Sequence, residues 1–536
     1  MKRIDCLLIG HNEMDFETYE KSVQRMGKKS GAYRDLNLSF INWNGKNHTA
    51  PEIFNLLYGN NNDGAHRVKP LSMLDTFSAT ISYLGSYLHK HGLIFDYVHS
   101  FQREKSELSA KLMKEDILTI AITTTYYVSF VPILEIIAYI RTYNKTAKII
   151  IGGPFVSTQF RSQDPASLEF LFESLGADFY VNSSQGEAAL IAIINALKNN
   201  SPMESIDNIY YKTPNGSFGA TPIVPEDNRL AENRVNWSLF ADRIDEFVNV
   251  RTAISCPFSC AFCGSPEHAG AYQTIGVAEV ENELNQLATI DSLKSVHFIE
   301  DTLNVPVERL KEILRMMIKN KYHFKWHSYF RCQFADRETV ELMKESGCIG
   351  VYLGLESGNN RILQNMNKAA TVEKYRDGTA LLKEYGITMH GNFIIGFPGE
   401  TPETVQDTIH FIKESGIDFF RVQLWYGMPI TPIWKQKEKY NIQGNSFEWS
   451  HHTMDSTTAC DLIDRIFLSI KEPVWVPQFN FDINSLFHLW LRGMTWEQIN
   501  DFLHAFNNGI REKLIDPSRT GMSPQVVSQF QKGEQK

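Results

Sequence analysis

The stretch SCPFSCAFCGSP, residues 255–266, decides the fold of this chain. It holds three cysteines, Cys256, Cys260 and Cys263, in the spacing C-x-x-x-C-x-x-C. A closed zinc site needs four Cys or His ligands, whereas a [4Fe–4S] cluster held by three thiolates leaves one iron open to a small chelating ligand. The spacing therefore favours a cluster over zinc or over three buried structural cysteines. The open iron would be the active site.

Composition limits the classes of function. The 536 residues carry a formal charge of −9, so we expect no nucleic-acid partner and no anionic membrane surface. The apolar stretch Ile117–Ile140 is long enough for a bilayer, but Thr123–Thr125 and Pro132 divide it into a strand and a helix. Seven cysteines, an odd number, indicate a reducing compartment and predict a cytoplasmic protein.

The N-terminal part alternates short apolar runs with helical patterns. This alternation predicts an α/β domain with a doubly wound, mostly parallel sheet over residues 1–215, followed by a linker over 216–245. The expected strands are Ile4–Ile9, Leu93–Val98, Ile117–Thr123, Lys148–Ile151 and Asp178–Val181.

A second alternating region predicts a partial (β/α)6 barrel over residues 246–450, with function on the loops that follow its strands. A mainly helical domain that caps the substrate is expected over 451–536. The expected barrel strands are Val248–Ile254, Ser295–Ile299, Trp326–Phe330, Gly350–Leu355, Gly391–Gly396 and Phe419–Leu424.

Two glycine-containing loops follow strands of the first domain. Gly152 and Gly153 close the run IIIGGP, and Ser184, Gly186 and Glu187 follow the run DFYVN. Ligands of doubly wound sheets bind at the carboxyl ends of strands, where glycine permits close backbone approach. Each loop can also be only a tight strand-to-helix turn.

The motifs around the cysteines resemble those of the radical SAM superfamily. The triplet reads C-x-x-x-C-x-aromatic-C, with Phe262 before the last cysteine. Further matching stretches are VHFIEDTLNVPVERL, GCIGVYLGLESGNNRILQNMNK, GNFIIGFPGET and MPITP. The resemblance implies that the open iron chelates S-adenosylmethionine (SAM), which one electron cleaves to a 5′-deoxyadenosyl radical. It also implies that the residues that hold SAM are Glu356 and Ser357, with Glu300, Asp301 and Arg331 near its charged end.

The N-terminal half resembles the cobalamin-binding domain of one radical SAM subgroup. IIIGGPFVS and LGADFYVNSSQGEAAL carry the likeness, which implies cobalamin at Gly152, Gly153, Ser184, Gly186 and Glu187. No D-x-H-x-x-G motif occurs, so the resemblance implies base-off cobalamin with a weak lower ligand or none. We expect the loop of Thr124, Thr125, Tyr126 and Tyr127 at its lower face. The alternatives are that these residues simply end a strand, or that the domain binds nothing.

With both cofactors, the resemblance implies a methyltransferase that uses methylcobalamin and an external donor such as flavodoxin or ferredoxin. Cys6–Ile41 and Trp449–Asp455 are similar to phosphinothricin-type P-methyltransferases. The expected substrate is a small-molecule or peptide-linked natural-product intermediate, methylated at an unactivated carbon or a phosphinate phosphorus. His451, His452 and Asp455 are candidates to face it, although adjacent histidines are more often exposed or hydrogen-bonded.

Other functions use the same framework. Ring contraction or cyclisation without methyl transfer fits it equally, and so does a non-enzymatic binding role if a cofactor is lost. Methylthiotransferases need a second cysteine triplet in the N-terminal domain, where only Cys6 is present.

Overall fold

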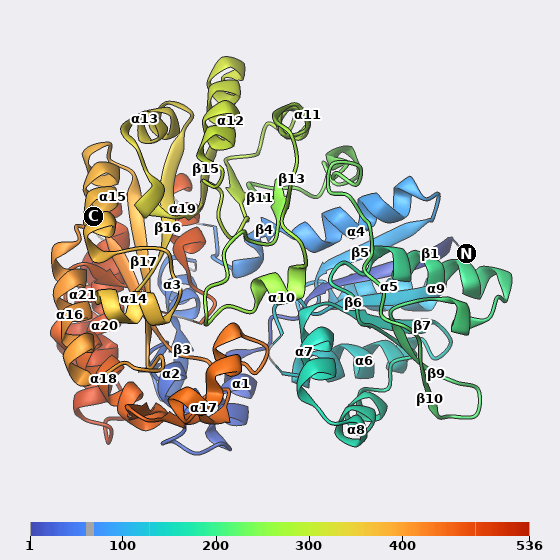
Figure 1. Ribbon diagram of the computed structural model, residues 1–536, viewed down its shortest axis with the longest axis horizontal. Helices are drawn as coiled ribbons and strands as arrows, with labels where there is room; N and C mark the ends of the chain where they lie inside the picture. The colour runs from blue at the N-terminus through green and yellow to red at the C-terminus, as the bar shows by residue number, and fades with distance from the viewer. Residues whose placement is uncertain (1, 60–68, 128, 478, 535–536) are drawn as a thin grey trace. The chain divides into compact units, whose positions relative to one another are not determined.

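The structure is a computed structural model that describes residues 2–59, 69–127, 129–477 and 479–534 (Figure 1). The chain divides into two compact units. Unit 1 comprises Met1–Met14, Thr76–Pro257 and Gly264–Leu293. Unit 2 comprises Asp15–Asp75, Phe258–Cys263 and Lys294–Lys536.

Unit 1 contains a seven-stranded sheet in the order β10-β9-β8-β7-β6-β1-β5. Its parallel strands are β1 (Arg3–His11), β5 (Phe95–Ser100), β6 (Asp116–Thr123), β7 (Lys148–Gly152) and β8 (Phe179–Val181), whereas β9 (Ile209–Lys212) and β10 (Phe218–Ala220) pair antiparallel. A short parallel pair, β4 (Thr76–Phe77) with β11 (Phe247–Val250), lies apart from this sheet. The predicted doubly wound sheet is confirmed.

Helices cover both faces of the unit 1 sheet. Figure 1 shows α4 (Ala79–Lys90) on one side and α6 (Val131–Tyr143) and α8 (Pro165–Leu175) on the other. The strands bury Ile, Leu and Val on both faces, which is typical of a sheet covered on both sides. The remaining helices are α5 (Lys105–Lys114), α7 (Pro154–Ser162), α9 (Glu187–Asn199), α10 (Ser265–Ala269) and α11 (Val277–Leu287).

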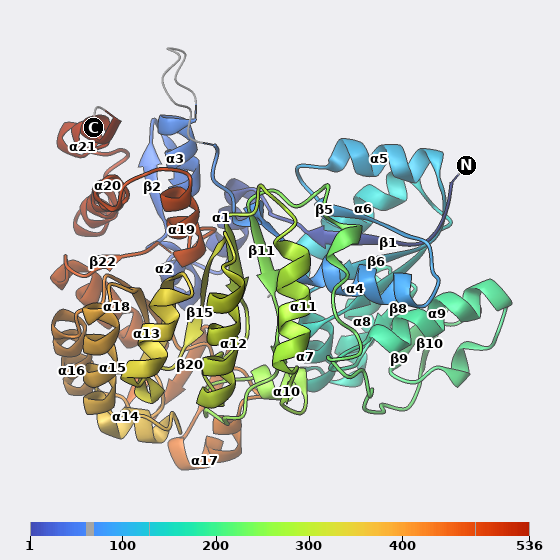
Figure 2. The ribbon, with the colours of Figure 1, turned by 90° about the horizontal axis from the view of Figure 1, so that it is seen from above.

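Unit 2 contains parallel strands in the order β22-β18-β17-β16-β15-β14. These are β14 (Ser295–Phe298), β15 (Lys325–Phe330), β16 (Cys348–Glu356), β17 (Thr388–Ile395), β18 (Phe419–Leu424) and β22 (Val474–Trp475). Helices alternate with them and form an outer row in Figure 2: α12 (Val307–Asn320), α13 (Arg337–Glu345), α15 (Val372–Glu384) and α16 (Pro402–Glu414). This part agrees with the predicted barrel, and its first predicted strand lies in unit 1 as β11.

The C-terminal region is mainly helical, as predicted. It contains α18 (Ser456–Ser469), α19 (Ile483–Leu491), α20 (Trp496–Ile515) and α21 (Pro524–Glu534). The segment WSHHTMD belongs to the hairpin β20 (Glu448–His451) and β21 (Met454–Asp455), and Asp455 caps α18. No helix among the described residues is long and apolar enough to cross a membrane.

The division differs from the expected boundaries at residues 15–75. This segment belongs to unit 2, not to a continuous domain over 1–215. It contains α1 (Phe16–Gln24), α2 (Gly31–Leu36), α3 (Ala50–Tyr58) and the hairpin β2–β3 (Phe40–Trp43, Lys46–Thr49). The half-buried Lys513 of α20 donates to the carbonyls of Asn37 at 2.7 Å and Phe40 at 2.6 Å. Contacts this distant in sequence leave no local signal, so the sequence did not reveal them.

Candidate active site

The cysteine loop of unit 2 is fixed by backbone hydrogen bonds to segments far along the chain. The amide of Ala261 donates to the carbonyl of Met366 at 2.7 Å, and the amide of Ile433 donates to the carbonyl of Ala261 at 2.9 Å. The amide of Cys263 donates to the carbonyl of Cys260 at 3.0 Å. The stretches that resemble the fourth-strand motif and the MPITP turn therefore hold the loop in place.

Arg331 lies against this loop at the end of β15. Its Nη2 donates to the Sγ of Cys260 at 3.3 Å, and its Nη1 donates to the carbonyl of Lys368 at 3.1 Å. The guanidinium covers the ring of Phe258 at 3.7 Å from the centroid. Arg331 is 8% exposed. A buried cation that donates to a thiol sulfur stabilises the thiolate, which is the form that binds iron.

A buried ion pair follows at the end of β16. Lys368 Nζ lies 2.8 Å from Glu356 Oε1, and both side chains are less than a tenth exposed. Glu356 has a φ of 65° at an irregularity in the pairing of β16 with β17. A Cβ at Gly354 would lie 2.6 Å from the carboxylate, so glycine makes room for it. The buried Ser357 lies beside Thr408 of α16, with 3.4 Å between the hydroxyl oxygens.

The residues after β14 reach the same loop indirectly. Asn304 donates to the carbonyl of Arg331 at 2.9 Å and accepts from its amide at 3.0 Å. Glu300 is buried, whereas Asp301 is exposed. The loop that carries both predicted carboxylates is thus joined to Arg331.

The boundary between the units falls within the cysteine triplet. Cys256 belongs to unit 1, and Cys260 and Cys263 belong to unit 2. Over the residues that the structure describes, no group of three or more His, Cys, Asp or Glu side chains could hold a metal ion. The three-thiolate cluster therefore stays a prediction from the sequence.

In unit 1, the predicted cobalamin residues meet at the carboxyl ends of β6, β7 and β8. Thr123 pairs with Gly152, and Gly152 pairs with Val181. Thr124 is fully buried, and its Oγ1 donates to the carbonyl of Gly152 at 2.8 Å. Gly153 has a φ of 108°, and a Cβ there would lie 2.9 Å from Thr124 Oγ1. The edge consists of backbone and small side chains, which fits a large, flat cofactor.

The loop after β8 contributes a second glycine and a buried carboxyl. Gly186 has a φ of 84° and precedes α9. Glu187 begins this helix, and it accepts a hydrogen bond from Asn228 at 3.2 Å. Burial raises the pKa of Glu187. Glu187 therefore supports the loop from inside the fold, whereas Ser184 is exposed beside it.

Only part of the loop that was predicted to face the lower side of cobalamin is accessible to solvent. Thr125 Oγ1 lies 3.4 Å from Thr80 Oγ1, and Tyr126 is 58% exposed. Tyr127 is buried and accepts from the amide of Asn12 at 2.7 Å. The four residues Thr124 to Tyr127 thus differ in role, although their sequence suggested one surface.

A cavity of about 80 Å³ lies among inward-facing residues of the unit 2 strands. The rings of His297 and His327 stack at 4.5 Å, and His327 Nε2 lies 2.6 Å from Asn484 Oδ1 of α19. Tyr352 lines the cavity and donates to Asn392 at 2.9 Å. Barrel interiors are usually filled by branched aliphatic side chains, so this polar lining is unusual.

The charges around this cavity are nearly balanced. Burial lowers the pKa of His327 to about 4 and that of His297 well below its ordinary value, so both rings are neutral at pH 7. Arg421 lines the cavity, and its charge lowers the pKa of the half-buried carboxyls of Asp35 and Asp482, against the larger effect of desolvation. Burial raises the pKa of Asp35 to about 6 and also raises that of Asp482.

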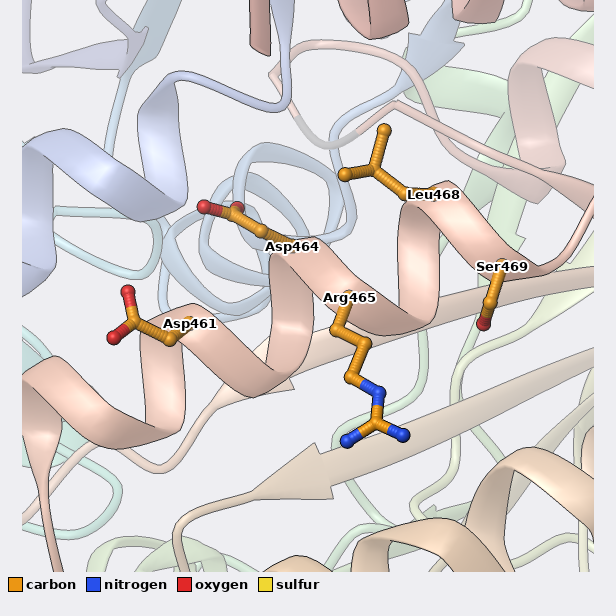
Figure 3. Close-up of a pocket in the computed structure, with 5 residues that line it drawn as sticks. All are labelled: Asp461, Asp464, Arg465, Leu468 and Ser469. Carbon is orange, nitrogen blue, oxygen red and sulfur yellow. The ribbon is translucent and has the colours of Figure 1, made fainter. Parts of the chain in front are cut away.

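A shallower hollow runs along α18 (Figure 3) and is lined by Asp461, Asp464, Arg465, Leu468 and Ser469. Arg34 of α2 pairs with both Asp461 and Asp464. These ion pairs join α2 to α18 and account for the acidic residues.

Lys368 and Glu400 are buried residues that sequence reasoning did not single out, whereas His451 was a candidate to face the substrate. Lys368 lies within a quoted motif, but a lysine twelve residues after Glu356 gave no sign that the two would pair. Glu400 is fully buried in the GFPGET stretch, accepts from the amide of Gly396 at 2.5 Å, and has a pKa that burial raises to about 8. His451 is buried and lies 3.0 Å from the carbonyl of Gly396. Burial raises the pKa of Cys332 to about 12, which makes it a core thiol.

Comparison with known proteins agrees with these motifs. Residues 251–412 match the Radical SAM superfamily model. An uncharacterised methyltransferase of Pyrococcus horikoshii is 28% identical over 358 residues, which cover 64% of this chain and 74% of that protein. A bacteriochlorophyllide d C-12(1)-methyltransferase of Chlorobaculum tepidum is 26% identical over 43% of this chain and 50% of its own length.

Solved structures share the fold. The radical SAM methyltransferase TsrM from Kitasatospora setae, with cobalamin and a [4Fe–4S] cluster bound, matches with a TM-score of 0.60 and 17% identity over the full length of both chains. The cobalamin-dependent SAM radical enzyme OxsB matches with a TM-score of 0.59 and 14% identity over 85% of this chain and 81% of that chain. Residues 251–412 therefore match the radical SAM superfamily, and the fold of the chain is similar to that of these solved structures.

Proposed function

We propose that the chain is a cobalamin-dependent radical SAM methyltransferase. Its substrate is a small-molecule or peptide-linked natural-product intermediate, which it methylates at an unactivated carbon or a phosphinate phosphorus. The observation that carries the proposal is the hydrogen bond from the buried Arg331 to Cys260, in a loop anchored to the SAM-type motif at Met366. A core thiol would not need a buried cation at its sulfur.

The residues fit both cofactors. Cys256, Cys260 and Cys263 would hold the cluster, and Glu356, Ser357 and the Asn304–Arg331 junction would hold SAM. Gly152, Gly153, Ser184 and Gly186 would support cobalamin at the strand ends of unit 1. When bound, the cluster with SAM supplies a 5′-deoxyadenosyl radical, and methylcobalamin supplies the methyl group.

The protein residues bind, orient and exclude water. Lys368 pairs with the Glu356 carboxylate at 2.8 Å and holds it in place, which suits it to accept hydrogen bonds from a polar group of SAM. Arg331 holds the Cys260 sulfur in place. The phenyl rings of Phe258 and Phe262 lie against Arg331 and Lys368, where they exclude water from both cations.

The cavity at His297 and His327 supports a further detail about the substrate. Its histidines are neutral, and the cation Arg421 already has the carboxyl of Asp482 beside it in the lining. Such a cavity suits an uncharged donor-and-acceptor group, such as a hydroxyl or a carboxamide, better than a second anion. A phosphinate would then lie outside this cavity, nearer the strand ends.

The test is anaerobic reconstitution of the full chain with iron, sulfide and hydroxocobalamin, followed by SAM and a reductant. We expect 5′-deoxyadenosine and S-adenosylhomocysteine in near-equal amounts that rise together when an accepted phosphinate peptide is added. Deoxyadenosine without S-adenosylhomocysteine would refute methyl transfer and favour ring contraction or cyclisation. An absence of both products would refute radical SAM catalysis.

A further inference from the structure

The unit 1 sheet reverses its winding between β1 and β6. The parallel strands follow the order β8-β7-β6-β1-β5, so the chain moves to one side of β1 for β5 and to the other side for β6. Ligands of doubly wound sheets bind at such a switch point, outside the carboxyl ends of the two strands. His11 is the last residue of β1, and Thr124 to Tyr127 follow β6.

The imidazole of His11 lies against that loop. It stacks on Tyr127 at 5.2 Å between ring centroids and meets the edge of Tyr126 at 5.3 Å. The loop beneath is rigid, because Tyr127 accepts from the amide of Asn12 and Asn12 donates to Glu135 at 2.9 Å. His11 itself is only half-buried, so a ligand at the switch point can reach it.

The hydroxyl groups of the same loop are less suited to bind a metal. Thr124 donates to the carbonyl of Gly152, Thr125 lies beside Thr80, and Tyr127 accepts from Asn12. A neutral imidazole nitrogen is the metal ligand that proteins use most often.

We propose that a ring nitrogen of His11 is the lower ligand of the cobalt, in place of the nucleotide base. This inference rests on the proposed function, because it requires cobalamin at this edge. It replaces the expectation of a weak lower ligand or none at Thr124, Thr125 and Tyr126. No sequence motif predicts this ligand, since GHNEMD lacks the D-x-H-x-x-G spacing.

Electron paramagnetic resonance of the full-length protein loaded with cob(II)alamin tests the proposal without turnover. Protein is prepared once with ordinary histidine and once with ¹⁵N-histidine. A histidine ligand splits the cobalt lines into triplets in the first sample and doublets in the second. Triplets in both samples would identify the cofactor's own base as the ligand, and unsplit lines would mean an oxygen ligand or none. Either result would overturn the proposal.

Two variants identify the histidine. His11→Phe keeps a ring against Tyr126 and Tyr127 but removes the nitrogens, so the doublets should disappear. His89→Phe changes an exposed histidine on α4 of the same unit and should leave them unchanged. Doublets that survive His11→Phe would overturn the assignment. Failure of the wild-type chain to bind any cobalamin would refute this inference together with the cobalamin part of the proposed function, whereas a bound cofactor without histidine splitting refutes only the inference.

Discussion

The two candidate cofactor sites differ in the chemical groups that form them. In unit 1, the edge consists of backbone, two glycines with positive φ and small hydroxyl side chains. In unit 2, the site consists of buried charges: Arg331 on the Cys260 sulfur and Lys368 on Glu356. A large neutral ring system needs room and close backbone approach, whereas a sulfur cluster and a charged small molecule need countercharges. Substitutions should therefore act through shape in unit 1 and through charge in unit 2.

The largest effect is expected from the cysteines. Replacing Cys256, Cys260 and Cys263 together by Ala should abolish the cluster's visible absorption and all formation of 5′-deoxyadenosine, because no thiolate remains to hold iron. Changing the buried Cys348 to Ala is the control and should keep both signals. If the triple variant still formed 5′-deoxyadenosine, this result would contradict the assignment of the cluster to these cysteines.

The second prediction concerns the buried ion pair between Lys368 and Glu356, whose loss should lower the free energy of unfolding. Lys368→Met leaves Glu356 buried without its partner, and we expect the free energy of unfolding to fall by about 3 kcal/mol. The double variant Lys368→Met, Glu356→Met should recover much of this loss in urea denaturation, although it should not bind SAM. Arg337→Met, which breaks an exposed pair with Glu384, is the control and should change stability by less than about 1 kcal/mol. Equal losses in the two single variants would contradict the role of burial.

A substitution at Gly153 tests whether the shape of the unit 1 strand ends controls cobalamin binding. An alanine there brings its Cβ within 2.9 Å of Thr124, and about 1.4 kcal/mol of strain would weaken cobalamin binding about tenfold. Gly216→Ala is the matched control, because Gly216 also has a positive φ in unit 1 but no atom within 4 Å of the added Cβ. Cobalamin titration followed by visible absorption measures both. Similar binding by the two variants would argue against a cofactor at the Gly153 edge.

The charge of Arg331 beside the Cys260 sulfur should change the reduction potential of the cluster. Arg331→Met removes the donor to Cys260, and hydrogen bonds to sulfur stabilise the reduced, more negative cluster. We therefore expect a lower midpoint potential in a potentiometric titration followed by electron paramagnetic resonance. Arg376→Met, at an exposed pair with Glu414, should not change the potential. If the potential of Arg331→Met were unchanged, Arg331 would pack against the loop without affecting the reduction potential of the cluster.

A pH dependence of stability is expected at Glu400. Burial raises the pKa of this carboxyl to about 8 in the folded chain, so between about pH 4.5 and pH 8 the folded state binds a proton that the unfolded state releases. Its contribution to stability is complete below about pH 4.5 and is lost as the pH rises to 8, by at most about 1.4 kcal/mol per unit. Glu400→Gln should flatten this part of the curve of unfolding free energy against pH. An unchanged slope would mean that Glu400 does not bind the extra proton.

Much of the fold follows from local patterns. The strands of both regions were predicted to within a few residues, because alternating strands and helices leave a clear hydrophobic period. The cysteine spacing and the motifs around Glu356 and Gly396 indicated the superfamily for the same reason. Each of these signals lies within a short stretch of chain.

What the sequence by itself determined is therefore the fold class, the superfamily and the residue types of both sites. The tertiary structure alone decided the partners of those residues: Lys368 for Glu356, Arg331 for Cys260, His11 for the loop after β6, and the packing of residues 15–75 in unit 2. These pairings join residues from 12 to more than 400 positions apart. Their energies come from burial and countercharge, which depend on the folded surroundings and leave no periodic trace in the sequence.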